Sequence, residues 1–213
     1  MQKSIYMMLS LLAVGVVGST SQATQRIGLI AQAAIPTGAN DLNQSNNVGS
    51  RSGLYYLRDV TPNLSFGGEF NYFYLPSKNH RQLSANGGEQ MNRATAQTMT
   101  FEAIGRYNIS PEAKWNPYVQ GGVGLARYHQ TTRSTPDAGS AWADTGTNEE
   151  RTIARDTSTS YALSGTIGVE RALTDSILLG LDGTWDVWGV SHSKFGTDTI
   201  NIPSVGLKLS WKY

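Results

Sequence analysis

The 213-residue sequence contains no cysteine. Disulfide-stapled scaffolds are therefore excluded, and stability in an oxidising compartment must come from the packed chain itself. The sequence also lacks an excess of one charge, because 17 lysines and arginines stand against 16 aspartates and glutamates, for a net charge of +1. A balance this close to neutrality does not indicate a polyanionic partner, so we expect no binding of nucleic acid.

Long apolar runs are missing as well. The longest, residues 5–17, is shorter than the roughly 18 to 20 residues that a bilayer-spanning helix needs. It follows Lys3 and precedes the small-residue site Ser21-Gln22-Ala23, which is the arrangement of a secretory signal peptide. We therefore predict a signal peptide over residues 1–23 and a single mature domain over residues 24–213.

What the sequence does contain is alternation of apolar and polar residues with a period of two. In residues 205–213 every odd position is apolar or aromatic and every even position is small or charged. This pattern is typical of a β-strand with one apolar and one polar face. Each run is near the ~9 to 11 residues of a tilted transmembrane strand. Seven further runs begin near Ile27, Ser50, Leu64, Met99, Tyr118, Tyr161 and Ile177.

The connections between these eight runs alternate between long and short. The long ones are residues 36–49, 76–97, 129–159 and 189–199, and the short ones are residues 59–63, 110–117 and 172–176. This asymmetry is typical of membrane barrels. We predict an all-β fold, an eight-stranded antiparallel transmembrane β-barrel with short periplasmic turns and long extracellular loops. Interfacial aromatic girdles are predicted at Tyr107, Trp115, Tyr118, Trp211 and Tyr213 on one side and Tyr72, Tyr74, Tyr128 and Trp188 on the other.

Three segments and the terminal strand resemble the OmpA-like or opacity-type family of eight-stranded outer-membrane β-barrels. The segments are LRDVTPNLSFG (57–67), WNPYVQGGVGLA (115–126) and GVERALTDS (168–176). The resemblance implies a place in the outer membrane of Gram-negative bacteria, among its lipids and lipopolysaccharide. It also implies insertion by the barrel-assembly machinery, with the C-terminal signal on Val205, Leu207, Leu209, Trp211 and Tyr213. The sequence ends with the barrel, so we do not expect the peptidoglycan-binding domain that follows the barrel in OmpA.

The charged residues of the strands fall mostly on the polar, inward faces. An eight-stranded barrel encloses only enough space for side chains, so we expect these groups to form a network that fills the lumen. The alternative is a gated narrow conduit whose ion pairs exchange partners. The predicted network comprises Arg58, Glu69, Glu102, Arg106, Glu170, Asp182, Asp186, Lys208 and Lys212.

The sequence favours a non-enzymatic surface scaffold whose loops make adhesive or envelope contacts with host or other surface ligands. Arg127, on the outward parity of its strand, is a candidate for contact with lipopolysaccharide phosphate, and Arg133 lies nearby; the alternative is a loop arginine that is merely solvated. A narrow porin-like channel is the alternative. A lipid A deacylase is a more distant one, because that family shows His-x-Ser-Asn whereas His192 and Ser193 are adjacent here and face opposite ways in a strand. No catalytic, cofactor-binding or metal site is predicted.

Overall fold

The computed structural model describes residues 24–37, 47–77, 79–136, 151–192 and 196–213, except residues 84–88. The signal peptide predicted over residues 1–23 lies outside the described residues. Within them, no helix is long and apolar enough to cross a membrane. The strands are β1 (Gln25–Ala34), β2 (Gly49–Asp59), β3 (Leu64–Leu75), β4 (Asn79–Leu83), β5 (Glu89–Asn108), β6 (Trp115–Pro136), β7 (Arg151–Ala172), β8 (Ile177–His192) and β9 (Gly196–Lys212).

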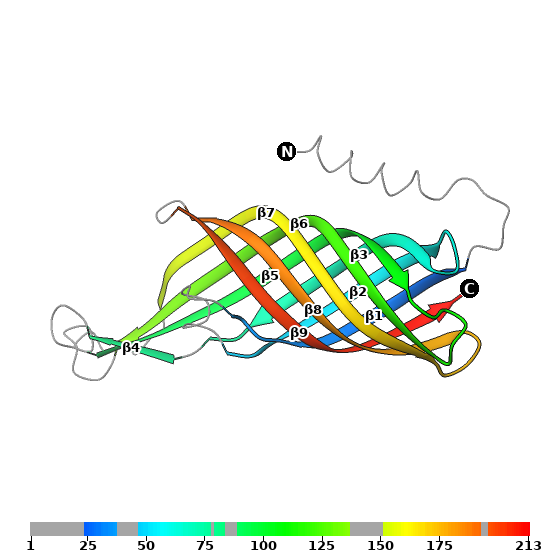
Figure 1. Ribbon diagram of the computed structural model, residues 1–213. Coiled ribbons are helices and arrows are strands. Elements are labelled where there is room, and N and C mark those ends of the chain that lie inside the picture. Colours follow the sequence, from blue (N-terminus) through cyan, green and yellow to red (C-terminus); the bar gives the residue numbers. More distant parts are fainter. Residues whose placement is uncertain (1–23, 38–46, 78, 84–88, 137–150, 193–195) are drawn as a thin grey trace.

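Eight of these strands close into a barrel (Figure 1). Neighbours pair antiparallel in the order β3-β2-β1-β9-β8-β7-β6-β5, and β3 pairs with β5 to complete the ring. The first and last strands meet in the register Leu29 opposite Leu209, and the backbones of Gln25 and Tyr213 exchange two hydrogen bonds of 3.1 Å. β4 pairs with β5 alone and lies outside the ring. The predicted eight-stranded antiparallel barrel is confirmed.

The three short connections are tight turns at the end of the barrel that also holds Gln25 and Tyr213, here called the turn end (Figure 1). Residues 60–63, 109–114 and 173–176 make them, close to the predicted ranges. Two of the turns use a threonine in the same way. The hydroxyl of Thr61 accepts a hydrogen bond from the Leu64 backbone, and that of Thr174 accepts one from Ile177, each at 3.0 Å. Such local bonds are the reason that hydroxyl residues favour turns.

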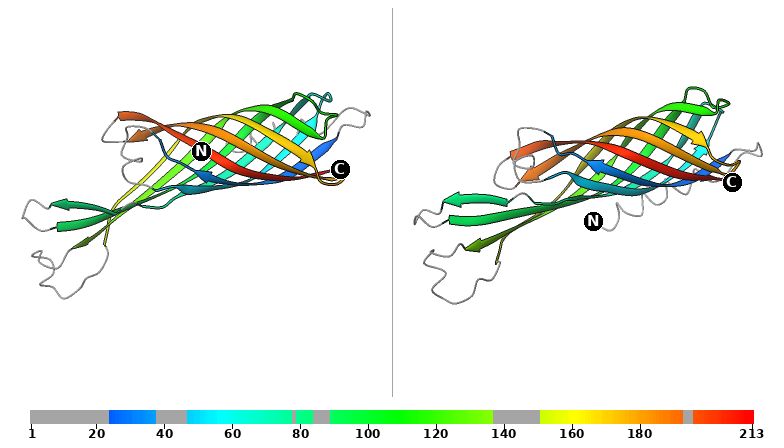
Figure 2. Two further views of the ribbon diagram at one scale, coloured as in Figure 1. Left: turned by 60° about the horizontal axis from the view of Figure 1, so that its bottom comes forward. Right: turned by 90° about the horizontal axis from the view of Figure 1, so that it is seen from below.

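At the opposite, loop end the strands run further than the sequence predicts. β6 continues to Pro136 and β7 begins at Arg151, so the predicted boundaries of the loop over residues 129–159 are wrong, as are those over 76–97 and 189–199. The added segments are rich in Thr, Ser and Gln and do not alternate, because beyond the membrane neither strand face needs to be apolar. β7 pairs with β6 down to Arg151 but with β8 only from Ala162. β4 and the ends of β5, β6 and β7 therefore project as an arm (Figure 2).

The outward face of the barrel is apolar on every strand of the ring. Representative side chains are 46–70 % exposed: Leu29, Leu54, Phe66, Phe101, Val123, Ile167, Leu181 and Leu207. Exposed aromatic side chains flank this band, with Tyr107, Trp115 and Tyr213 at the turn end and Tyr74, Tyr161 and Trp185 at the loop end. A continuous apolar belt between aromatic girdles is the lipid-facing surface of a transmembrane barrel.

Three of the predicted girdle residues face the lumen instead. Tyr118, Tyr128 and Trp188 are at most 2 % exposed. Glycines opposite make room for such rings on the inside. A Cβ atom on Gly168 would lie 2.6 Å from the Tyr118 ring, so this close approach requires glycine.

Candidate functional site: the filled lumen

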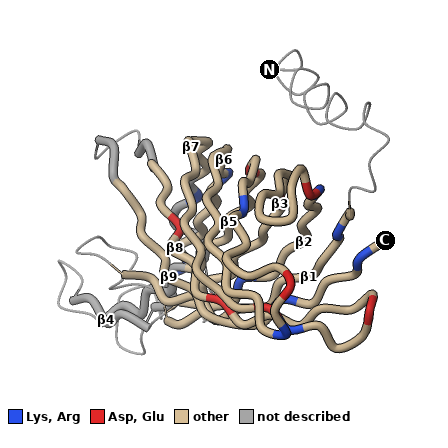
Figure 3. Tube along the Cα trace, turned by 45° about the vertical axis from the view of Figure 1, so that its right-hand side comes forward, with Lys and Arg blue, Asp and Glu red and all other residues tan. Residues whose placement is uncertain are grey.

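Nine charged side chains point into the barrel and are each at most 5 % exposed. Positively and negatively charged residues are interspersed along the strands of the barrel (Figure 3). Because a buried charge costs several kcal/mol unless it is paired, their partners determine what the lumen can do. We call these side chains the lumen network; its members are Arg26, Arg51, Glu69, Glu102, Arg106, Glu170, Asp182, Asp186 and Lys208.

At the turn end the network is organised around Glu170 of β7. Its carboxylate accepts hydrogen bonds from Arg106 at 2.5 Å and from Arg26 at 3.3 Å. Arg26 also pairs with Asp59 at 2.6 Å. The Arg106 guanidinium lies 4.0 Å from the centroid of the Tyr118 ring, which adds a cation–π contact inside the pair.

The middle of the lumen is bridged by Arg51 and Lys208. Arg51 lies 2.6 Å from Glu69 and 3.3 Å from Asp186. Lys208 lies 2.8 Å from Asp182 and 4.0 Å from Glu69. Glu69 therefore touches both cations, and the ion pairs reach across the barrel from β2 and β3 to β8 and β9.

Neutral side chains complete the bonding of the same carboxylates. Asp182 accepts hydrogen bonds from the Gln32 amide at 2.5 Å and the Tyr118 hydroxyl at 2.9 Å. Glu69 accepts from Gln120 at 2.9 Å and from Asn71 at 3.0 Å. Buried charges are thus held by amides and hydroxyls as well as by opposite charges, which is what a stable buried network requires.

Glu102 is the exception. It stands directly opposite Glu69 in the strand register, and among the described residues no cation lies within ion-pair distance of it. Its Oε2 accepts a hydrogen bond from Ser164, while its Oε1 is buried without a hydrogen-bond partner among the described residues. Asp186 has its ion pair with Arg51 but no hydrogen bond within the described part of the chain. The network has four cations and five carboxyl groups, and Glu102 is the carboxyl group that has no cation partner among the described residues.

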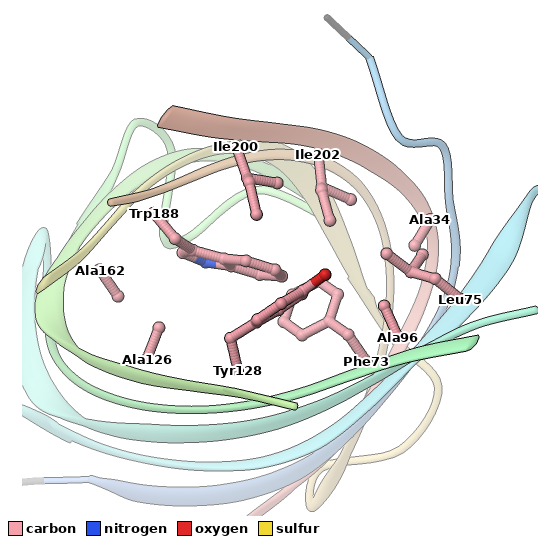
Figure 4. Packing of buried hydrophobic residues seen from close by; sticks show 10 residues of the cluster. All are labelled: Ala34, Phe73, Leu75, Ala96, Ala126, Tyr128, Ala162, Trp188, Ile200 and Ile202. Carbon is pink, nitrogen blue, oxygen red and sulfur yellow. The ribbon is translucent and has the colours of Figure 1, made fainter. Parts of the chain in front are cut away.

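Toward the loop end the lumen is filled by apolar side chains instead. Figure 4 shows these residues converging inside the barrel. The Trp188 and Phe73 rings meet edge to face, with centroids 4.7 Å apart. The Arg51 guanidinium lies 5.4 Å from the Phe73 ring and marks the border with the lumen network. We call this set the apolar layer: Ala34, Phe73, Leu75, Ala96, Ala126, Tyr128, Ala162, Trp188, Ile200 and Ile202.

The structure brings together seven of the nine residues predicted for the lumen. Two differ. Lys212 is half-buried at the turn end, opposite Arg26 in the register, and takes part in no ion pair among the described residues. Arg58 lies on the outward side of β2, so its predicted inward position is wrong. The inward positions of β2 include the apolar residues Tyr55 and Leu57, so polarity did not distinguish the two faces of this strand.

Sequence reasoning missed Arg26, Arg51 and the apolar layer. Arg26 precedes the apolar run that starts at Ile27, on the alternate positions that continue through Gln32. Extending that run by one residue would have found it. Arg51 shares its parity with Tyr55 and Leu57, and because that face of β2 mixes charged and apolar residues, polarity alone did not identify it as the inward face.

The other predicted positions are placed as follows. β9 pairs with β1 and β8, and Val205, Leu207, Trp211 and Tyr213 are exposed while Leu209 is half-buried. His192 ends β8, and its neighbour Ser193 lies outside the described residues. Within the described part of the chain, no cluster of His, Asp and Glu side chains is arranged to hold a metal ion.

Comparison with known proteins supports the fold. No protein-family model matches the sequence, and no curated protein matches it. Neisserial surface protein A is similar in structure, with 13% identity and a TM-score of 0.53 over 92% of this chain and 100% of that chain. This is the fold of outer-membrane β-barrels. Ail, the attachment invasion locus protein of Yersinia pestis, is 9% identical with a TM-score of 0.52 over 91% of this chain and 100% of that one. A major outer membrane protein of Thermus thermophilus is 12% identical with a TM-score of 0.50 over 91% and 100%.

Proposed function

We propose that this protein is a small, non-enzymatic barrel of the bacterial outer membrane that serves as a scaffold for contacts at the cell surface. The observation that carries the proposal is the filled lumen. Ion pairs cross the middle of the barrel, and the apolar layer fills the loop end with side chains at most 4 % exposed. A barrel filled in this way is a stable support for its extracellular segments, and it leaves no path for a solute.

The energetics of the lumen network argue against conduction. An ion entering the lumen would have to separate the pairs of Arg51 and Lys208 with their carboxylates, and leaving a buried charge unpaired costs roughly 3–5 kcal/mol. It would also have to pass the packed rings of Trp188 and Phe73, which offer a hydrated ion no hydrogen-bonding group other than the buried indole N–H of Trp188. We infer that the resting barrel is closed.

The comparisons are consistent with a surface role. Ail, which shares the fold, is an attachment invasion locus protein, and one of its structures holds the heparin analogue sucrose octasulfate. By the family resemblance of its sequence, we infer that this protein belongs with the OmpA-like or opacity-type barrels. We infer further that the barrel-assembly machinery recognises the strand that ends at Tyr213, and that outer-membrane lipids and lipopolysaccharide surround the barrel.

Conductance tests the closed lumen. The refolded protein, placed in planar bilayers, is expected to show no steady current of nanosiemens size, and Glu102→Ala is expected to behave in the same way. That substitution removes a carboxylate without an ion-pair partner among the described residues and so leaves the other pairs in place. A stable nanosiemens conductance of the unaltered protein would contradict the scaffold proposal and favour the porin-like channel.

Adhesion tests the surface role. Cells that display the protein are compared with cells that display a variant in which a short Gly-Ser linker replaces residues 137–150. We expect the variant to insert normally, as judged by its heat-dependent mobility on gels, but to adhere less to cultured epithelial cells. The proposal would be contradicted if cells with the variant and cells without the protein both adhered as well as cells with the unaltered protein.

A further inference from the structure

One face of the arm carries arginines immediately beyond the apolar belt. On β6, the exposed Leu125 is followed on the same side by Arg127, and on β7 the exposed Tyr161 is followed by Thr159. The register places Arg127 opposite Thr159. We call this surface the cationic face; it comprises Arg127, His129, Thr131 and Arg133 of β6 with Arg155, Thr157 and Thr159 of β7.

The charge of this face is of one sign. Arg127, Arg133 and Arg155 are all exposed, and no carboxylate is among the described residues of the face. Within the described part of the chain, neither Arg127 nor Arg155 has an ion-pair partner. The remaining groups are hydroxyls and an imidazole, and His129 is held by Thr157 at 2.8 Å and Thr131 at 3.3 Å. The face therefore offers positive charge and hydrogen-bond donors together.

Its depth matches the head groups of the outer leaflet. Arg127 lies two residues beyond Leu125, about 7 Å along the strand, which is the first polar level outside the acyl chains. Arg133 lies six residues further from Arg127, about 20 Å along a tilted strand. Arg155 is opposite Thr131 and so belongs to this outer level. The arginines thus occupy two depths above the hydrocarbon region.

The turn end of the barrel is different. Arg171 packs its guanidinium 5.2 Å from the Trp115 ring, and the adjacent turns expose both acidic and basic residues, including Glu112, Lys114 and Asp175. Arginine binds phosphate oxygens in bidentate geometry, so a face that has arginines and no carboxylate among its described residues, at head-group depth, fits a phosphorylated lipid. The asymmetry points to the leaflet at the loop end.

We propose that the cationic face binds the phosphate groups of lipopolysaccharide in the outer leaflet. Arg127 contacts the phosphates next to the acyl chains, and Arg133 and Arg155 contact those further out. This proposal rests on the outer-membrane location given under the proposed function, and it names the residues and the chemical group of one partner. Free phosphate shares this chemistry, so the test separates the two sources.

The test measures binding of fluorescent lipopolysaccharide to the protein in phosphatidylcholine nanodiscs. The triple variant Arg127→Gln, Arg133→Gln, Arg155→Gln is expected to bind about 10-fold more weakly or worse. Arg171→Gln, which removes an arginine at the other end, is expected to bind as the wild type does. Enzymatically dephosphorylated lipopolysaccharide is expected to bind the wild type as weakly as intact lipopolysaccharide binds the triple variant. Heat-dependent gel mobility verifies that each variant is folded.

Three results would overturn the proposal. The first is equal affinity of the wild type and the folded triple variant for lipopolysaccharide, and the second is equal binding of dephosphorylated and intact lipopolysaccharide to the wild type. The third is complete displacement of lipopolysaccharide by millimolar inorganic phosphate, which would identify a free-phosphate site. None of these results depends on conductance or adhesion. A conducting barrel would contradict the proposed function and leave this site standing, so the two failures are distinguishable.

Discussion

The two halves of the lumen differ in what fills them, although both are built from alternate residues of the same strands. Toward the turn end, ion pairs share the lumen with a small apolar cluster of Ile30, Tyr55, Leu57 and Ile104, whereas the apolar layer fills the loop end. Toward the turn end, Arg106 and Glu170 are typical, each held by a specific partner at hydrogen-bond distance. Toward the loop end, Trp188 and Phe73 are typical, held by shape and packing. Stability in the first half depends on which charge meets which, while stability in the second depends on how much volume is filled. Substitutions distinguish the two.

The largest expected loss follows removal of one buried charge. Arg106→Ala leaves the Glu170 carboxylate with Arg26, at 3.3 Å, as its one cation among the described residues, so we expect the free energy of unfolding to fall by about 3–5 kcal/mol. Urea titration of the protein in phospholipid vesicles measures it. Lys114→Ala, on an exposed turn at the same end, is the control and should cost less than about 0.5 kcal/mol.

A double variant of the same pair, Arg106 and Glu170, extends this experiment. Arg106→Met with Glu170→Leu removes both charges and fills the space with apolar atoms, and Arg26 keeps its pair with Asp59. We expect the double variant to be more stable than Arg106→Ala, because no charge is left alone. Equal instability of the two variants would mean that packing, not charge pairing, governs this half of the lumen.

The apolar layer is expected to respond to truncation differently. Trp188→Ala removes a ring that is 1 % exposed and should cost about 3 kcal/mol through the cavity it leaves. Adding Phe73→Ala, on the other side of the ring contact, should make the loss of stability larger. In the lumen network, by contrast, changing Glu170 together with Arg106 should make the loss smaller than changing Arg106 alone. Recovery of stability in the Trp188 and Phe73 double variant, measured by the same titration, would remove the distinction between the halves.

The sequence predicted the barrel and most of the lumen network because both are encoded by alternation. Where one face is apolar and meets lipid, the other face follows by parity, which located Glu69, Asp182 and Lys208. The prediction of which residues face inward failed where the two faces of a strand do not differ in polarity. β2 places Tyr55 and Leu57 inside and Arg58 outside, and Trp188 was assigned to a girdle by residue type although it shares its parity with Asp186. The apolar layer is invisible to alternation, since its members are apolar residues on the inward face.

Pairing within the network was equally beyond the sequence, because it depends on register between strands far apart in the chain. Glu69 and Glu102 are both inward glutamates, yet only the first touches Arg51 and Lys208. Alternation assigns them the same role, and the register places them opposite each other. Their difference leads to the next prediction.

Neutralising these two glutamates is expected to have opposite effects. Glu69→Gln weakens the pair with Arg51 and should cost about 2 kcal/mol, less than the roughly 3–5 kcal/mol of a fully broken buried pair, because Arg51 keeps its pair with Asp186. Glu102→Gln removes a charge that faces another carboxylate and keeps an acceptor for Ser164, so stability should be unchanged or rise by up to about 1 kcal/mol. Each variant is the isosteric control for the other in urea titration. A loss of stability in the Glu102 variant as large as that in the Glu69 variant would show that the carboxylates of the lumen network contribute to stability whether or not they have a cation partner.

The smallest effect on stability is expected outside the lumen, at the last residue. Tyr213 is 67 % exposed, and its bonds to Gln25 are made by backbone atoms, so Tyr213→Ala keeps them and should change the free energy of unfolding by less than about 0.5 kcal/mol. If the terminal aromatic is read by the assembly machinery, the same variant should reach the outer membrane more slowly in pulse-labelled cells. Trp115→Ala, an exposed aromatic at the same end of the barrel, is the matched control. Slow insertion of both variants would mean that the delay comes from loss of an interfacial aromatic residue in general. A delay in the Tyr213 variant alone would show that this residue is needed for assembly, in contrast to the lumen residues, which are needed for stability.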